Sequence, residues 1–183
     1  IQFYQYYNEK PQSKFGLPMV LSLSALRMKN YDMSGLDSIR SQPYFIVGKT
    51  LMTQKNGFHP SGIPIKSITR DSLVFSSFYD TYVFLRVPDS LKGNRSIDFA
   101  NRYFILNNDT IHFTENEMFQ RNAPNEKPKW LHASYHVFDM GGFQFLADGF
   151  GNIVVLKYQQ DTINFYLLGM DTIAEIPFIE VQP

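Results

Sequence analysis

The stretch RYFILNNDTIHFTE (Arg102–Glu115) decides the fold class, because two apolar runs in it are joined by a short polar corner. Aromatic and β-branched residues fill both runs, which is typical of β-strands. The corner, Asn-Asn-Asp, consists of residues that tolerate turn dihedrals and hydrogen-bond to their own backbone. The stretch therefore predicts a β-hairpin.

The second run, DTIHF (Asp109–Phe113), recurs as DTINF (Asp161–Phe165) and DSLVF (Asp71–Phe75), with shorter copies at Asp37–Ile39 and Asp171–Ile173. Each full copy begins at a break between apolar runs. Its Ile or Leu and its Phe lie two positions apart, so they would point to the same face of a strand. The uneven spacing of the copies disfavours a solenoid or propeller. We interpret this repeated motif as the end of a turn followed by two core residues, not as a repeated functional site.

The same pattern continues outward along the chain, for example in PYFIVGKTLMT (Pro43–Thr53) and in WLHASYHVFDM (Trp130–Met140). About nine or ten such runs are separated by polar, Gly- or Pro-bearing corners. No amphipathic helical pattern follows residue 30. We predict an all-β fold, an antiparallel sandwich or barrel, formed by one domain over residues 1–183. For the aromatic-rich residues 1–18 the sequence predicts a short N-terminal helix or, alternatively, an arm or linker.

The composition limits the class of partner. Lys plus Arg equals Asp plus Glu, so the net charge is zero and no basic field for nucleic acid is expected. Cysteine is absent, which excludes disulfides, thiolate metal sites and thiol nucleophiles. No apolar stretch reaches the roughly 20 residues of a transmembrane helix. Because the numbering starts at Ile1 and not at Met, we expect that a start codon, a signal peptide or a lipidated cysteine was removed before this numbering begins.

The histidines are the first candidates for a metal site. His132 and His136 have the spacing that binds one metal on a helix, but the surrounding sequence predicts a strand. Four residues along a strand cover about 13 Å, which one ion cannot bridge. ADGFGN (Ala147–Asn152) offers two side chains of a calcium loop and is interpreted as a hairpin turn. We predict no metal and no cofactor.

One face of the predicted strand WLHASYHVFDM is the candidate binding surface. The other face, which includes Ala133 and Tyr135, has the composition of a core. The candidate face is amphipathic and aromatic, so it could line a pocket or groove or face solvent. Its residues are Trp130, His132, Ser134, His136 and Phe138.

No motif identifies a catalytic residue. The chain lacks the Gly-x-Ser-x-Gly elbow and the Gly-rich phosphate-binding loops. A hydrolase with a His/carboxylate site on strand-end loops remains an alternative, in which His59, His132 or His136 would be the base.

In composition and turn style the chain resembles the uncharacterised exported lipoproteins of Bacteroidetes-type bacteria. The resemblance rests on abundant Asn, Tyr, Phe and Lys, the turns NNDTI and QQDTI, the missing cysteines and the start at Ile1. It implies export to the periplasm or outer surface, a lipid anchor near the N-terminus and an antiparallel β fold. It assigns no functional residue.

Three functions follow from these observations. The first is a non-enzymatic cell-envelope domain that binds a small molecule, a glycan or a protein partner, because rigid aromatic rings suit such ligands. The second is the hydrolase described above. The third is a structural or assembly subunit, which would expose an apolar patch to its neighbour.

Overall fold

The fold of this 183-residue chain was established from a computed structural model. It describes residues 2–5, 19–25, 27–32, 39–55, 59–76, 81–93, 97–106, 109–121, 130–149, 152–159, 162–168 and 173–181. These residues form sixteen β-strands and one short 3₁₀ turn, η1 (Asp89–Leu91). All pairings between neighbouring strands are antiparallel, so the predicted all-β antiparallel fold is confirmed. The strands outnumber the nine or ten predicted, in part because the run Pro43–Thr53 contains a two-residue turn and forms two strands.

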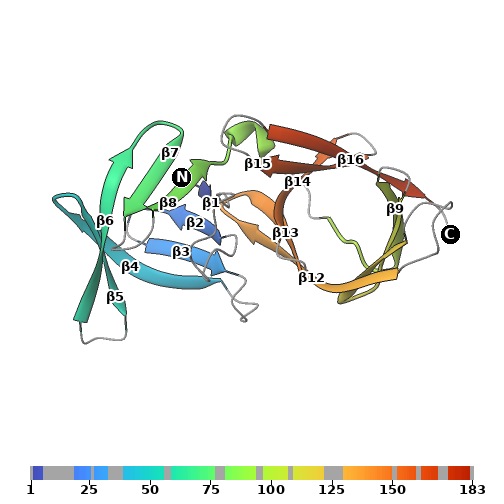
Figure 1. The fold of residues 1–183 in the computed structure, drawn as a ribbon, viewed down its shortest axis with the longest axis horizontal. Helices are drawn as coiled ribbons and strands as arrows, with labels where there is room; N and C mark the ends of the chain where they lie inside the picture. Colours follow the sequence, from blue (N-terminus) through green and yellow to red (C-terminus); the bar gives the residue numbers. More distant parts are fainter. Residues whose placement is uncertain are drawn as a thin grey trace. The chain divides into compact units, whose positions relative to one another are not determined.

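The chain divides into two compact units, residues 1–88 and 89–183. The first unit contains eight strands (Figure 1). They are β1 (Gln2–Gln5), β2 (Met19–Leu23), β3 (Arg27–Asp32), β4 (Arg40–Val47), β5 (Thr50–Lys55), β6 (His59–Ile68), β7 (Ser72–Ser76) and β8 (Thr81–Arg86).

The second unit begins with η1 and also contains eight strands. They are β9 (Arg102–Leu106), β10 (Asp109–Phe113), β11 (Glu117–Arg121), β12 (Trp130–Met140), β13 (Phe143–Asp148), β14 (Ile153–Gln159), β15 (Thr162–Leu168) and β16 (Ile173–Val181).

Each unit is a closed up-and-down barrel, in which every strand pairs with its neighbours in sequence and the first strand pairs with the last. In the first barrel β1 pairs with both β2 and β8. In the second barrel β9 pairs with both β10 and β16. Closure removes the unpaired outer edges of an open sheet, except where a strand changes partner along its length, as β4 and β6 do in the first barrel. The prediction of one domain over residues 1–183 does not anticipate this division, because short turns of the same kind occur throughout the chain.

The N-terminal prediction is wrong for the residues that the structure describes there. Gln2–Gln5 form a strand that lies between β2 and β8, not a helix or a free arm. Residues 6–18 lie outside the described residues.

Strands β4 and β6 each change partner along their length. β4 pairs with β3 over Arg40–Pro43 and with β5 over Tyr44–Val47. β6 pairs with β5 up to Pro64 and then with β7 from Ile65. β5 and the adjoining halves of its two neighbours therefore form a three-stranded ribbon, which we call the β4–β6 ribbon.

The two units carry opposite charge. Residues 1–88 contain ten Lys/Arg and five Asp/Glu, whereas residues 89–183 contain seven and twelve. The net charge of zero is thus the sum of +5 and −5. The exclusion of nucleic acid rested on the charge of the whole chain, so it stays a prediction.

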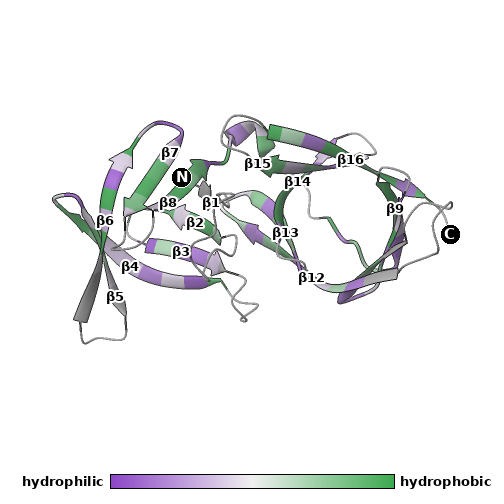
Figure 2. Ribbon diagram, viewed as in Figure 1, coloured by the Kyte–Doolittle hydropathy of each residue, from purple (hydrophilic) through white to green (hydrophobic). Residues whose placement is uncertain are grey.

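The repeated motif supplies core residues, as predicted. In its three full copies the Ile or Leu and the Phe are buried in a barrel core, with every one of these side chains 8% exposed or less. Figure 2 shows the apolar character of β7, which carries one copy, against the more polar β4. The buried pairs are Leu73 and Phe75, Ile111 and Phe113, and Ile163 and Phe165. Period-two patterning therefore set which side chains face inward.

Strand β13 is buried on both faces, which explains why its sequence is nearly continuous in apolar residues. Leu146 faces the barrel core, whereas Phe143 and Phe145 lie on the opposite face. The segment that contains η1 lies near this outer face, because Lys157 Nζ on β14 donates to Ser90 O at 2.8 Å. The ammonium of Lys92 lies 5.5 Å from the ring centroid of Phe143.

Candidate functional site

The interior of the second barrel is the first place to look for a ligand site. Eight-stranded barrels either fill their interior with side chains or hold one small ligand. Here the interior is packed with side chains, among them Phe104, Phe113, Leu156 and Ile163, each 2% exposed or less. In the described part of this barrel, therefore, the interior is a core.

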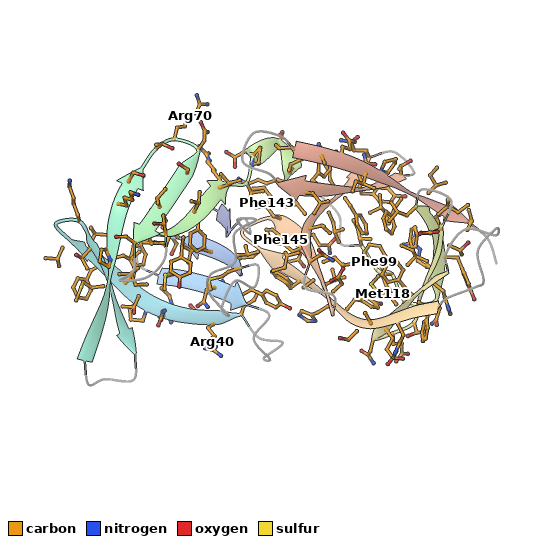
Figure 3. The ribbon with its side chains drawn as sticks, viewed as in Figure 1. Arg40, Arg70, Phe99, Met118, Phe143 and Phe145 are labelled. Carbon is orange, nitrogen blue, oxygen red and sulfur yellow. The ribbon has the colours of Figure 1, made fainter. Side chains whose placement is uncertain are left out.

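Phe99 completes this packing although it belongs to no strand. Its ring lies inside the barrel (Figure 3), with centroid distances of 4.8 Å to Phe113, 5.4 Å to Phe104 and 6.0 Å to Phe165. Offset and edge-to-face ring pairs at such distances stabilise a core beyond simple burial. We call the segment Ile97–Asn101 the plug.

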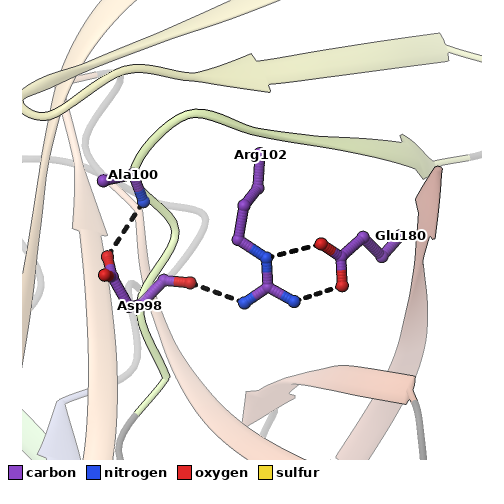
Figure 4. Close-up of polar contacts among 4 residues, drawn as sticks. All are labelled: Asp98, Ala100, Arg102 and Glu180. Carbon is purple, nitrogen blue, oxygen red and sulfur yellow. Dashed lines mark hydrogen bonds and ion pairs between the residues drawn. The ribbon is translucent and has the colours of Figure 1, made fainter. Parts of the chain in front are cut away.

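Hydrogen bonds hold the plug in place. The N–H of Ile97 donates to Oε1 of the buried Gln144 at 2.9 Å. Arg102, which directly follows the plug, reaches back so that its Nη1 donates to the carbonyl of Asp98 at 2.6 Å (Figure 4). Asn101 between them has a φ of 59°, a left-handed conformation that Asn tolerates better than most residues. The chain thus turns sharply from the plug into β9.

Arg102 also closes the barrel, because its guanidinium pairs with both carboxylate oxygens of Glu180 on β16. The hydrogen bond from Arg102 holds the pKa of the Glu180 carboxyl below its usual range, and the same bond raises the pKa of Arg102. Both side chains are partly exposed, so solvent screens the pair. The pair links the first strand of the barrel to the last, 78 residues apart.

The predicted strand β12 is present, and its alternate residues face the core. Ala133 is buried, and Tyr135 and Val137 pack against the same core. The face that starts at Trp130 is therefore the outer surface of the barrel. The side chain of Trp130 lies outside the described part of the structure.

The described members of this face lie in two different surroundings. His132 and Ser134 are exposed, whereas Phe138 is buried and stacks on Phe145 at 5.2 Å. His136 stacks on Phe138 at 5.9 Å. The structure thus groups His136 with Phe138 but places His132 with residues of the neighbouring strand β11.

His132 is one end of a row of rings that crosses four strands. The row, which we call the ring strip, contains Tyr103 on β9, His112 on β10, Phe119 on β11 and His132 on β12. Direct cross-strand register joins each ring to the next. The centroid distances along the row are 4.1, 6.2 and 4.8 Å, and the largest angle between neighbouring ring planes is 28°.

The stacking decides what the ring strip can present to a partner. Tyr103 and His112 cover one face of each other at 4.1 Å, and Phe119 and His132 stack at 4.8 Å, whereas the rings of His112 and Phe119 are 6.2 Å apart. The ring edges carry the Tyr103 hydroxyl, the imidazole nitrogens and the electropositive C–H groups of Phe119. The strip spans about 14 Å, three strand spacings of roughly 4.8 Å. Ile105 and Ile179, paired across β9 and β16, are exposed on the same outer surface.

The strip also contains a His–carboxylate pair. His132 Nε2 lies 2.8 Å from Glu117 Oε1, and the two side chains are 53% and 47% exposed. This pair is the part of the hydrolase alternative that the structure supplies. Ser134 lies two positions from His132 on the same strand face, which separates their side chains by about 6–7 Å. A nucleophile and its base need about 3 Å, so Ser134 does not complete a catalytic site.

The other predicted motifs have structural roles where the structure describes them. Asp148 accepts hydrogen bonds from the N–H of Asn152 at 2.9 Å and from its side-chain amide at 3.0 Å. This closes the β13–β14 turn, as predicted for ADGFGN. No cluster of three or more His, Asp or Glu residues that could hold a metal occurs among the residues described. His59 is in β6 of the first unit, and its side chain is not described.

Sequence reasoning missed Tyr103, His112 and Phe119. Each occupies the outward position beside a buried residue in RYFIL, DTIHF or EMFQR, and that alternation is visible in the sequence. What joins them is the register of three separate hairpins, which no single run contains.

Comparisons with known proteins assign no family. No family model matches the chain, and no curated protein sequence matches it. Among solved structures, one with detectable similarity is the DNA polymerase III beta chain of Streptococcus pneumoniae, at 7% identity and a TM-score of 0.17. The match covers 100% of this chain and 57% of that chain, so this chain spans little more than half of its length. A TM-score this low supports no conclusion about fold or function. None of the described residues forms a helix with the length and apolarity of a membrane span.

Proposed function

We propose that this chain is a non-enzymatic binding protein whose ring strip contacts a protein partner. The observation that carries the proposal is the row of four stacked rings on the outer surface of a barrel whose interior is occupied by Phe99. A barrel that bound a small molecule inside would need that space. Tyr, Phe and neighbouring isoleucines in one surface patch are typical of the centre of a protein interface.

Ring geometry favours a protein partner over a glycan. A sugar ring stacks on an open aromatic face, and the close pairs Tyr103–His112 and Phe119–His132 each cover one face of both of their rings. Hydroxyl and imidazole edges suit backbone carbonyls and carboxylates. A structural or assembly role would use the same surface.

The cell envelope is part of the proposal. It is supported by the resemblance to exported lipoproteins, and fractionation of native cells tests it. Recovery of the chain in the cytosol would contradict it.

Site-specific photo-crosslinking in native cells tests the surface. A photoreactive phenylalanine analogue at Phe119 should give one dominant crosslinked protein. The same analogue at Ile173, an exposed residue of the same barrel, is the matched control. Substitution of Tyr103 by Ala should reduce the Phe119 crosslink at least fivefold while the protein stays folded, with a loss of about 1 kcal/mol in unfolding free energy. Equal crosslinks from both positions would contradict the proposal.

The hydrolase alternative has its own test. If the Glu117–His132 pair were catalytic, Glu117→Gln would abolish turnover of ester and glycoside substrates. We expect wild-type protein to show no such turnover.

A further inference from the structure

The β4–β6 ribbon of the first barrel has an edge that no described strand occupies. β3 begins at Arg27, opposite Pro43, and no strand in the described ranges pairs with β4 beyond this point on that side. The N–H of Ile65 donates to the carbonyl of Lys49 at 2.7 Å. Successive residues of a β-strand direct their backbone N–H and C=O groups to opposite sides, so this one bond sets the direction of these groups for every residue of the ribbon. Tyr44 and Ile46 therefore point their backbone N–H and C=O groups toward this edge.

The side chains along this edge are apolar and exposed. Phe45, Ile46 and Val47 are 49%, 51% and 59% exposed, and they are consecutive in β4. An edge whose backbone groups pair with no strand among the described residues, and whose side chains are apolar, is a template to which another strand can add. Main-chain hydrogen bonds would give affinity, and the alternating side chains would give selectivity.

The opposite edge of the ribbon is protected. By the same alternation, Pro60, Gly62 and Pro64 of β6 direct their backbone away from β5. Proline has no N–H, so only Gly62 can donate a hydrogen bond along this edge. Proline on an edge strand is a common way to prevent strand addition. One edge of the ribbon is thus blocked, and the other is open.

Charge at the two ends of the open edge indicates the kind of partner. Arg27 lies at one end, exposed, with its Nε donating to Ser41 Oγ at 2.9 Å. Lys49, also exposed, lies at the other end in the turn after Val47. A second copy pairing β4 to β4 around Phe45 would place Lys49 of one copy opposite Ser41 of the other, next to Arg27, which donates to Ser41 Oγ at 2.9 Å. Like charges would then oppose self-association.

The geometry points to an extended peptide segment of another protein, with apolar residues at its centre and acidic residues at its ends. This segment adds antiparallel to β4, in line with β3. Its backbone pairs with Tyr44 and Ile46, and its acidic ends meet Arg27 and Lys49. The site lies in the first barrel, so it is independent of the ring strip.

The test uses a capped heptapeptide, Asp-Val-Thr-Val-Thr-Val-Asp, added to the full chain labelled with ¹⁵N. We expect saturable binding with the largest amide shifts at residues 44–47. A peptide with lysine in place of both aspartates should bind at least tenfold more weakly. Shifts that map elsewhere, equal binding of both peptides, or no binding of either peptide up to millimolar concentration would overturn the proposal.

Variants of the protein separate the contribution of charge to peptide binding from that of the backbone hydrogen bonds. Lys49→Glu should weaken binding of the Asp-ended peptide at least fivefold, and Lys66→Glu, at an exposed lysine of β6, is the matched control and should leave it unchanged. Ile46→Pro removes a donor on the open edge and should abolish binding. If Ile46→Pro perturbs the amide spectrum of the whole first unit, the comparison of Lys49→Glu with Lys66→Glu decides whether the peptide binds at this edge. Concentration-dependent dimerisation in sedimentation, lost in Ile46→Pro, would show a second copy at the edge and overturn the proposal.

Discussion

Replacement of Phe99 by Ala should destabilise the second barrel, because its ring is 1% exposed and contacts the rings of Phe104, Phe113 and Phe165. Loss of the buried ring removes about 2 kcal/mol of transfer free energy. A residual cavity on the order of 100 Å³ adds ~2.4 kcal/mol at about 24 cal/mol per Å³. We therefore expect a loss of about 4 kcal/mol in the free energy of unfolding, within the roughly 3–5 kcal/mol typical of buried Phe→Ala changes.

Tryptophan fluorescence can follow this unfolding selectively. Trp130 is the single tryptophan of the chain and belongs to β12 of the second unit. Urea titrations of wild type and Phe99→Ala give the difference in unfolding free energy. Phe119→Ala, at a half-buried position on the outer surface, is the control and should cost about 1 kcal/mol.

The cavity also gives a positive test. An empty apolar cavity binds small apolar molecules such as benzene. Benzene should therefore raise the urea midpoint of unfolding of Phe99→Ala but not that of wild type, because a ligand that binds only the folded state stabilises it by mass action. A loss below ~1 kcal/mol, or no benzene effect, would refute the inference that Phe99 fills the barrel.

Three further predictions concern stability. Because the pKa of Glu180 is lowered in the folded chain, its pairing with Arg102 contributes fully above the ordinary glutamate pKa of 4.5 and is lost as pH falls through the lowered value. Glu180→Gln should therefore lower the unfolding free energy by up to about 1 kcal/mol at pH 7, with the difference vanishing at low pH in parallel urea titrations. Asp148→Ala removes the acceptor for Asn152 and should cost about 1–2 kcal/mol by fluorescence-monitored melting, and an unchanged midpoint would argue against its role in the turn. Gly142 has a φ of 86°, so Gly142→Ala should cost at least about 1 kcal/mol in calorimetry, and a stabilised variant would contradict the left-handed turn.

The fold class could be predicted from local sequence because the evidence for it is local. Alternation of side chains along a strand placed Ile111 and Phe113 in the core, and the same reasoning placed Leu73 and Phe75 there. Turn chemistry located the Gly141–Gly142 and Asp148–Asn152 corners. The candidate face of β12 was correctly placed opposite the core residues of that strand.

The division into two barrels was decided by tertiary structure. It depends on which distant strands pair, β1 with β8 and β9 with β16, and the turns inside each barrel carry no information about those pairings. The number of strands was underestimated for a related reason, because a two-residue turn inside an apolar run hardly interrupts its hydrophobicity.

By itself the sequence determined which side chains share a face of each strand and where the chain reverses, since both depend on neighbouring residues. Only the tertiary structure decided that Phe99, outside any strand, fills the second barrel and that Tyr103, His112, Phe119 and His132 form one row. Packing in a closed barrel and register between strands are contacts between residues distant in sequence. Their free energy depends on the whole arrangement and not on any local pattern.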